Sequence, residues 1–134
     1  MNPDEPAFSA FKSRGGLQRI AGAMRYSLAG LRSAWKHEHA FRQEVMVIVP
    51  AAVVAVLLPV TGMERLLLLA SMVLVLVVEL LNSAIEAVVD RVSLERHPLS
   101  KNAKDFGSAA VMLAVLLSLA CWGVVLWGWW VGRA

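Results

Sequence analysis

The sequence predicts an all-α membrane protein with three transmembrane helices and an N-terminal amphipathic surface helix. Apolar residues make up 58% of the 134 residues, charged residues only 17%, and the mean hydropathy is +0.63. A soluble domain this small could not hide so much apolar surface from water. Charges are also absent from two long stretches, the 19 residues of 45–63 and the 27 residues of 106–132. These observations exclude a disordered chain, a nucleic-acid-binding arm and an ordinary soluble enzyme, so we expect no nucleic-acid partner.

The N-terminal part of the chain is expected to form a tail and then a surface helix. Residues 1–13 hold two prolines and mixed charge, which predicts a mobile tail, and a single membrane domain is expected over 14–134. Within about 15–35, apolar residues recur at helical spacing, namely Leu17, Ile20, Ala21, Met24, Leu28, Leu31 and Trp35. Basic residues flank this stripe, while Arg19 and Tyr26 point away from it. A basic amphipathic helix of this kind lies flat on a membrane, although the pattern alone would also fit a helix packed on a soluble core.

Three membrane spans are expected at about 38–59, 64–91 and 104–130. Pro50 lies inside the first span and Pro59 near its end, which predicts a kink followed by a stop. A turn at 59–62 separates the first two spans, and a loop over 92–102 that contains Pro98 is expected before the third.

Basic residues set the expected orientation in the membrane. Eleven of the 13 lysines and arginines lie in the N-terminal segment or around the second loop, and only Arg65 and Arg133 lie on the other side. Positively charged flanks stay in the cytoplasm. The N-terminus and second loop are therefore expected to be cytoplasmic, and Trp127, Trp129 and Trp130 to form a belt at the outer interface.

The second span carries polar residues that an apolar helix does not need. Glu79, Ser83, Glu86 and Asp90 fall within about 60° of one another on a helix, with Asn82 beside them. A carboxylate at a helix centre costs roughly 2.5–3.5 kcal/mol on insertion scales. Hydrogen bonding between helices would explain the amide and the hydroxyl but fits the paired glutamates poorly. The remaining interpretations are a cation site, a proton relay, or a general base beside a metal such as Mg²⁺, which prefers oxygen ligands.

Two further polar clusters are expected at the cytoplasmic ends of the other spans. Lys101, Lys104, Asp105 and Ser108 recur at helical spacing at the start of the third span, which suits an anion site as well as a simple positively charged flank. The start of the first span carries Glu38, Phe41, Arg42, Gln43 and Glu44. No P-loop, Rossmann glycine motif or protein-kinase signature occurs, so nucleotide chemistry here requires an unrelated scaffold.

Three segments resemble the prokaryotic integral-membrane diacylglycerol kinase family, which the match follows over about 19–130. They are 40–44 (AFRQE), 79–91 (ELLNSAIEAVVDR) and 103–110 (AKDFGSAA). The resemblance implies a homotrimer of three-span chains in the bacterial inner membrane. It also implies transfer of the γ-phosphoryl of MgATP to diacylglycerol at the cytoplasmic face, giving phosphatidic acid.

The resemblance also implies roles for individual residues. Glu79 corresponds to the catalytic base, Glu38 and Glu86 to ligands of the Mg²⁺ that accompanies ATP, and Asn82 to a polar residue of the active site. The other implied ATP contacts are Arg19, Tyr26, Glu95, Arg96, His97, Lys104 and Asp105. The implied lipid-side positions are Ala40, Phe41, Arg42, Gln43, Glu44, Ser108, Trp122 and Trp127, together with Glu79 and Asn82.

Two alternative functions fit parts of this pattern. Related bacterial chains phosphorylate undecaprenol, but their motif has threonine where Ser83 stands here, and the continuation to Arg91 favours diacylglycerol. A small proton-coupled transporter would also place a glutamate in a span. A transporter would not need Glu38 or the pair of Lys104 and Asp105.

Overall fold

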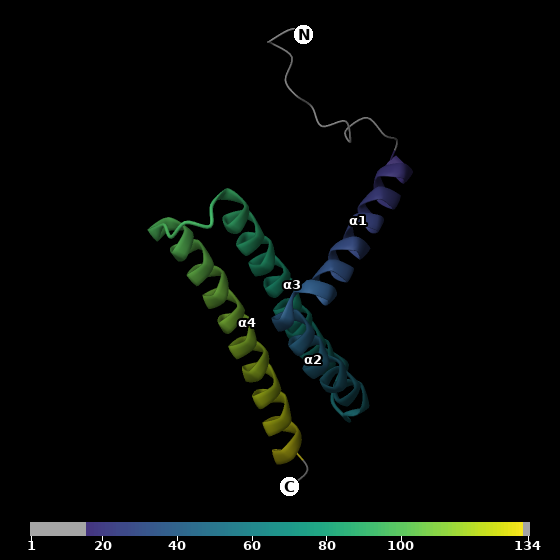
Figure 1. Ribbon diagram of the computed structural model, residues 1–134. Helices are drawn as coiled ribbons and strands as arrows, with labels where there is room; N and C mark the ends of the chain where they lie inside the picture. The colour runs from purple at the N-terminus through teal and green to yellow at the C-terminus, as the bar shows by residue number, and fades with distance from the viewer. Residues whose placement is uncertain (1–15, 133–134) are drawn as a thin grey trace.

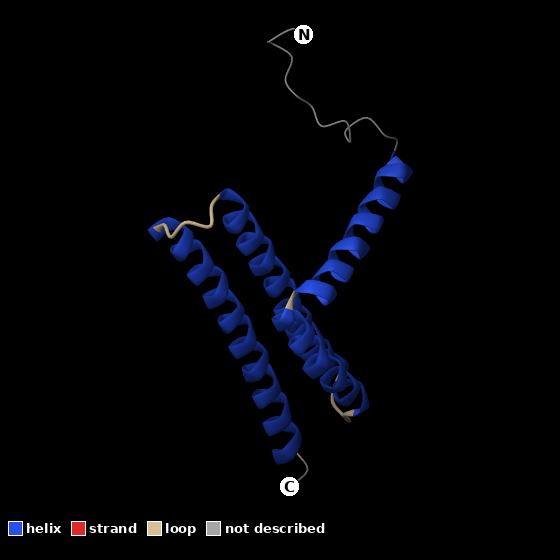
Figure 2. Cartoon of the chain, in the orientation of Figure 1, coloured by secondary structure: helices blue, strands red, loops and turns tan. Residues whose placement is uncertain are grey.

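The computed structural model describes residues 16–132, which form four helices and contain no strand (Figures 1 and 2). In chain order the helices are α1 (Gly16–His37), α2 (His39–Leu57), α3 (Gly62–Val92) and α4 (Pro98–Val131). Three of them, α2, α3 and α4, are long and apolar enough to cross a membrane. The predicted all-α fold with three candidate spans is therefore confirmed, whereas the tail predicted at 1–13 lies outside the described residues.

A break at Glu38 separates α1 from α2. Glu38 has an extended backbone (φ −96°, ψ 112°), and Arg42 beyond it donates hydrogen bonds from Nη1 to the carbonyl oxygens of Trp35 and Lys36, both at 3.0 Å. The last carbonyl groups of a helix have no partner within it, so Arg42 satisfies the end of α1 and fixes where α2 starts. From this joint α1 runs away from the other helices, as Figure 1 shows.

The apolar stripe of α1 is uncovered within the chain. Leu17 is 84% exposed and Leu28 60% exposed, and Ala34 is the only buried residue of this helix. The helix thus forms where the sequence predicts it, and its placement on a membrane surface stays a prediction.

The turn between α2 and α3 is held by side-chain caps. The helix α2 continues through Pro50 and ends at Leu57, before Pro59, because the residue preceding a proline disfavours helical geometry. Thr61 and Glu64 then form a reciprocal cap at the start of α3. The Thr61 hydroxyl accepts from the Glu64 amide at 3.3 Å, and the Glu64 carboxylate accepts from the Thr61 amide at 2.8 Å.

Arg65 closes the same turn from the side of α3. Its guanidinium donates to the carbonyl oxygens of Ala55 at 3.3 Å and Leu58 at 3.1 Å. Arg65 therefore satisfies the last carbonyls of α2 and ties α2 to α3.

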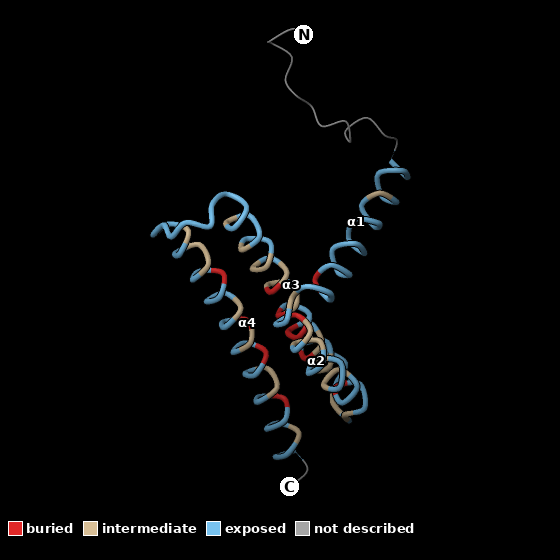
Figure 3. The backbone as a smooth tube through the Cα atoms, viewed as in Figure 1, coloured by how far each residue is buried: buried red, intermediate tan, exposed pale blue. Residues whose placement is uncertain are grey.

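The most extensive contact in the chain is between α3 and α4, which run antiparallel. The Ser71 and Ser118 hydroxyls lie 3.2 Å apart across this seam, and further along it Asn82 lies against Gly107. Both pairs belong to one antiparallel register. Figure 3 marks the buried positions that recur along the helices; on α4 they are Gly107, Ala114, Ser118 and Val125, and on α3 they are Leu68, Ser71, Met72, Val75 and Glu79.

The α3–α4 loop is shorter than the sequence analysis predicts. We expected a loop over 92–102 and a third span from about 104, but α4 already begins at Pro98. Proline is favoured in the first turn of a helix because its missing N–H needs no partner there. His97 caps this start, with its Nδ1 accepting from the Leu99 amide at 3.2 Å.

The helices differ greatly in length. At 1.5 Å per residue, the 19 residues of α2 span about 28 Å, close to the roughly 30 Å hydrocarbon core of a bilayer. The 31 residues of α3 span about 46 Å and the 34 residues of α4 about 51 Å. Because α2 and α3 are joined by a short turn at one end, the excess length of α3 lies at the end that leads into α4. The α3–α4 loop therefore extends well beyond the level at which α2 begins.

Candidate active site

The buried face of α3 continues directly into a row of carboxylates, Glu79, Glu86 and Asp90, which we call the carboxylate row. Val75 is buried among apolar residues, and Glu79, one turn further on, is only 4% exposed. Glu79 lies close enough to Glu86 and Glu38 for their charges to interact. Among residues 16–132, no lysine or arginine forms an ion pair with any of these three glutamates. A buried carboxylate surrounded by like charges is costly, and such an arrangement is typical of catalytic and cation-binding sites.

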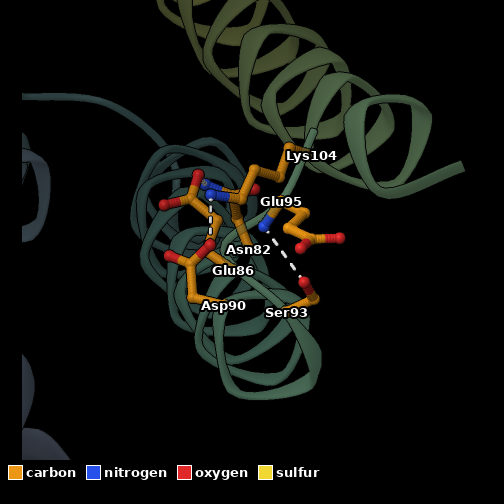
Figure 4. A network of polar contacts seen from close by, with 6 residues as sticks. All are labelled: Asn82, Glu86, Asp90, Ser93, Glu95 and Lys104. Carbon is orange, nitrogen blue, oxygen red and sulfur yellow. Dashed lines mark hydrogen bonds and ion pairs between the residues drawn. The ribbon is translucent and has the colours of Figure 1, made fainter. Parts of the chain in front are cut away.

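An amide connects the row to α4. Asn82 donates from Nδ2 to Glu86 Oε1 at 3.2 Å (Figure 4). Its Oδ1 is buried and has no hydrogen-bond partner in the described part of the chain. That oxygen faces Gly107 of α4, where a side chain would collide with it.

The far end of the row is joined to α4 by an ion pair. Asp90 at the end of α3 and Lys104 near the start of α4 lie 2.6 Å apart, and both side chains are about half exposed. Lys101 pairs with Asp105 one turn along α4. The predicted basic cluster therefore forms, and Lys104 points back toward the carboxylates of α3 (Figure 4).

A hollow of about 660 Å³ lies beside this ion pair, under the loop that joins α3 to α4. We call it the loop hollow. Five of the seven other ATP contacts implied by the resemblance line it, namely Glu95, Arg96, His97, Lys104 and Asp105. Arg19 and Tyr26 do not, because they lie on α1, which points away from the loop (Figure 1). One chain thus assembles only part of the expected nucleotide site.

A second cavity, of about 550 Å³, lies between the three candidate spans α2, α3 and α4. We call it the membrane groove. Its walls are apolar and include Ile48, Val75 and Trp122, while Gln43 and Glu44 form its polar end. The Glu44 carboxylate is near enough to Glu79 for their charges to interact. The groove therefore ends beside the carboxylate row.

The lipid-side positions predicted from the sequence are only partly brought together. Gln43, Glu44 and Trp122 line the membrane groove. Ser108 and Trp127 are exposed and lie outside its lining, as do Ala40, Phe41 and Arg42. Phe41 is buried in the fold, and the Arg42 guanidinium bonds the backbone at the end of α1.

The chain is similar to known proteins over most of its length. Residues 25–126 match the family model for prokaryotic diacylglycerol kinase. The chain belongs to the prokaryotic diacylglycerol kinase family. It is 56% identical to a diacylglycerol kinase of Pseudomonas aeruginosa over 120 residues (90% of this chain and 98% of the relative). It is 51% identical to a diacylglycerol kinase of Escherichia coli K12 over 112 residues (84% and 92%), and 44% identical to one of Haemophilus influenzae over 111 residues (83% and 94%).

Membership of the diacylglycerol kinase family makes the chain a membrane-bound lipid kinase, and the transporter alternative is therefore wrong. A kinase site must provide for a nucleotide and its metal. Within residues 16–132, no group of three or more His, Cys, Asp or Glu side chains is placed to hold a metal ion. Mg²⁺ in nucleotide sites commonly takes one or two carboxylates, with phosphates and waters completing its shell. The carboxylates of Glu38 and Glu86, which form no ion pair with a lysine or arginine among residues 16–132, fit a metal that arrives with the nucleotide.

Two further residues lie at this candidate site. Asp90 belongs to the polar stripe predicted on the second span, where the sequence gives it no role of its own, and the structure pairs it with Lys104. Gly107 lies against Asn82 and has no predicted role. Its signal was present, since a glycine inside a helix costs about 1 kcal/mol relative to alanine and usually has a packing reason.

Proposed function

We propose that the chain transfers the γ-phosphoryl of MgATP to the free hydroxyl of diacylglycerol at the cytoplasmic membrane face, giving phosphatidic acid. The observation that carries this proposal is the position of Glu79. On one side Glu79 is near Glu44, which forms the polar end of the membrane groove. On the other side it is near Glu86, which is followed on α3 by Asp90 and its partner Lys104. A lipid in the groove and a nucleotide at the loop hollow would therefore meet at the Glu79 carboxylate.

The carboxylates near Glu79 and the lysine that pairs with Asp90 each have a role in this reaction. Glu79 accepts the proton of the attacking lipid hydroxyl, which is general-base catalysis. Glu86 and Glu38 would hold the Mg²⁺ of MgATP, which would neutralise phosphate charge there. Lys104 exchanges Asp90 for the phosphate oxygens of the nucleotide, because both are anionic partners for an ammonium group. Phosphoryl transfer depends mainly on such positioning and charge neutralisation.

The membrane groove is suited to the hydrocarbon part of the lipid. Its lining is almost entirely apolar, and a volume of about 550 Å³ is in the range of small-molecule sites. The Gln43 and Glu44 side chains at its polar end are available to the glycerol oxygens. The free hydroxyl is then delivered toward Glu79.

A homotrimer would complete the site. Three spans and one surface helix are too few to enclose both a nucleotide and a lipid. The half-buried Glu86 must also face protein or water, because hydrocarbon cannot solvate a carboxylate. Within a trimer, α1 of one chain, with Arg19 and Tyr26, would cover the loop hollow of its neighbour. The uncovered stripe on α1 would lie on the membrane surface.

The distribution of basic residues supports a position in the bacterial inner membrane with the N-terminus in the cytoplasm. The loop hollow at the α3–α4 loop then opens to cytoplasmic ATP. The excess length of α3 and α4 carries it clear of the hydrocarbon.

The test measures transfer of label from [γ-³²P]ATP into extracted lipid. The purified full-length chain is assayed in mixed micelles with diacylglycerol or with undecaprenol. Labelled phosphatidic acid, absent without Mg²⁺, is expected. Label that enters undecaprenol in preference to diacylglycerol would contradict the proposed substrate, and no label in either lipid would contradict the proposed reaction.

The composite site is tested by mixing two inactive variants. One carries Arg19→Ala and Tyr26→Ala on α1, and the other carries Glu86→Leu on α3. Denatured together and co-reconstituted, they should recover part of the activity, because some mixed trimers contain one intact site. Mixed trimers without recovered activity would show that each chain builds its own site.

A further inference from the structure

Near the carboxylates of α3, α4 presents a glycine, Gly107, which has no side chain. Gly107 is buried on α4, and a Cβ atom placed there would overlap Asn82 Oδ1 and lie 3.2 Å from Asn82 Cγ. Real Cβ atoms do not come so near to another side chain. Gly128, on the same helix, has open space where its Cβ would be. Gly107 therefore makes room for one particular group, the Asn82 amide.

The Glu86 carboxylate decides which way the Asn82 amide faces. The Nδ2 atom donates to Glu86 Oε1 at 3.2 Å, and the Oδ1 atom faces Gly107. The reverse orientation would set the amide oxygen against the Glu86 carboxylate, and two acceptors repel each other. The observed orientation leaves Oδ1 buried without a hydrogen-bond partner in the described chain, which costs free energy. The bond from Asn82 Nδ2 to Glu86 Oε1 offsets part of that cost.

Glu86 has no other restraint of this kind. The bond from Asn82 is the only hydrogen bond that the structure gives its carboxylate within residues 16–132, and the nearby Lys104 ammonium, whose charge acts on Glu86, forms its ion pair with Asp90 instead. A glutamate side chain has several rotatable bonds, so a single donor strongly limits the positions of its oxygens. Such donors to metal-binding carboxylates typically affect metal affinity 10- to 100-fold.

We propose that Gly107 is a positioning residue for the metal-binding carboxylate: by leaving room for the Asn82 amide, it holds Glu86 in the orientation that receives the Mg²⁺ of MgATP. This inference rests on the proposed function, in which Glu86 is a ligand. This role requires no contact between Gly107 and substrate or metal. Gly107 acts through Asn82.

The experiment measures how much Mg²⁺ is needed to bind a non-hydrolysable ATP analogue. Binding of AMP-PNP to the full-length chain in micelles is followed while Mg²⁺ is titrated, and the thermal unfolding midpoint is recorded in parallel. Gly107→Ala and Asn82→Ala should each raise the half-saturating Mg²⁺ concentration about 10- to 100-fold. The double variant should match Asn82→Ala, because without the amide the new methyl group meets the Cα of residue 82 at 3.7 Å, an ordinary contact distance. Gly128→Ala is the matched control and should behave as the parent.

The double variant also separates positioning from packing. If Gly107→Ala does not fold, the inference requires that adding Asn82→Ala restores folding, with the Mg²⁺ midpoint of Asn82→Ala alone. A Gly107→Ala protein that unfolds at lower temperature but keeps the parent Mg²⁺ midpoint would overturn the inference. So would a double variant that remains unfolded or whose effects simply add.

Glu86→Gln distinguishes this inference from the function on which it rests. If that variant leaves the Mg²⁺ midpoint unchanged, the proposed ligand role fails. If it raises the midpoint while the Gly107→Ala and Asn82→Ala variants do not, only the role of Gly107 fails.

Discussion

Replacing Glu79 by glutamine should abolish turnover without unfolding the protein. Glutamine has nearly the shape of glutamate but cannot accept the hydroxyl proton. Loss of a general base typically costs about 10²–10⁴-fold in rate, which corresponds to about 2.7–5.4 kcal/mol of barrier. Glu79 is only 4% exposed and interacts with the like charges of Glu86 and Glu38. Removing its charge relieves that repulsion, so the free energy of unfolding should be equal to or greater than that of the parent.

The assay for Glu79→Gln combines three measurements on one preparation. They are kcat for phosphatidic acid formation, the dissociation constant of Mg²⁺ with AMP-PNP, and the thermal unfolding midpoint. The expected result is a greatly reduced kcat with nearly unchanged binding and no loss of stability. Glu64→Gln at the other end of α3 is the matched control, because glutamine can keep the cap with Thr61 and lies far from the site.

Two results would refute the reasoning for Glu79. Near-normal turnover would mean that positioning alone carries the chemistry. A loss of nucleotide binding as large as the loss of turnover would make Glu79 a ligand rather than a base.

Three further variants test other parts of the structure. Glu86→Gln should raise the Mg²⁺ concentration for half-maximal rate, and an unchanged midpoint with a lower maximal rate would argue against ligation. Lys104→Ala should raise KM for ATP more than for lipid, since it removes a cation placed to meet phosphate; an effect on the lipid alone would overturn that role. Arg65→Ala should lower the free energy of unfolding by about 1–3 kcal/mol with both KM values unchanged, as it leaves the carbonyls of Ala55 and Leu58 without their charged donor. A thermal scan showing parent-like stability would contradict it.

The membrane helices were predictable because apolar runs in a lipid solvent leave few alternatives. The turn before α3 was foreseen from Pro59, whose geometry ends a helix locally. The sequence predicts the start of α4 too late, because Pro98 fits a loop as well as the first turn of a helix, where proline is also favoured. Which of these roles a proline takes depends on the cap that precedes it, here His97.

The sequence predicts the site residues whose placement in a membrane span costs free energy, and it does not predict the contacts that depend on packing between helices. Glu79 and Glu86 attract notice because a carboxylate in a span requires a reason. Arg42 was expected at the lipid side, yet its guanidinium bonds backbone carbonyls of α1, a contact between two helices that no spacing along one helix reveals. Asn82 against Gly107 is likewise a fact of helix packing, and it depends on the register between α3 and α4.

Because α2 is short, the position of its polar end depends on the thickness of the bilayer. At about 28 Å, α2 matches a roughly 30 Å core with nothing to spare, and Glu38 stands at its very start. A thicker bilayer must thin locally around α2 or draw its polar end inward, and either response costs a fraction of a kcal/mol per ångström. The long α3 and α4, at about 46 and 51 Å, still span a thicker core. Because the capped turn and Arg65 tie α2 to α3 at the opposite end, lipids with longer acyl chains would bring the hydrocarbon up to Glu38 at the start of α2, and so change the surroundings of the first carboxylate of the site.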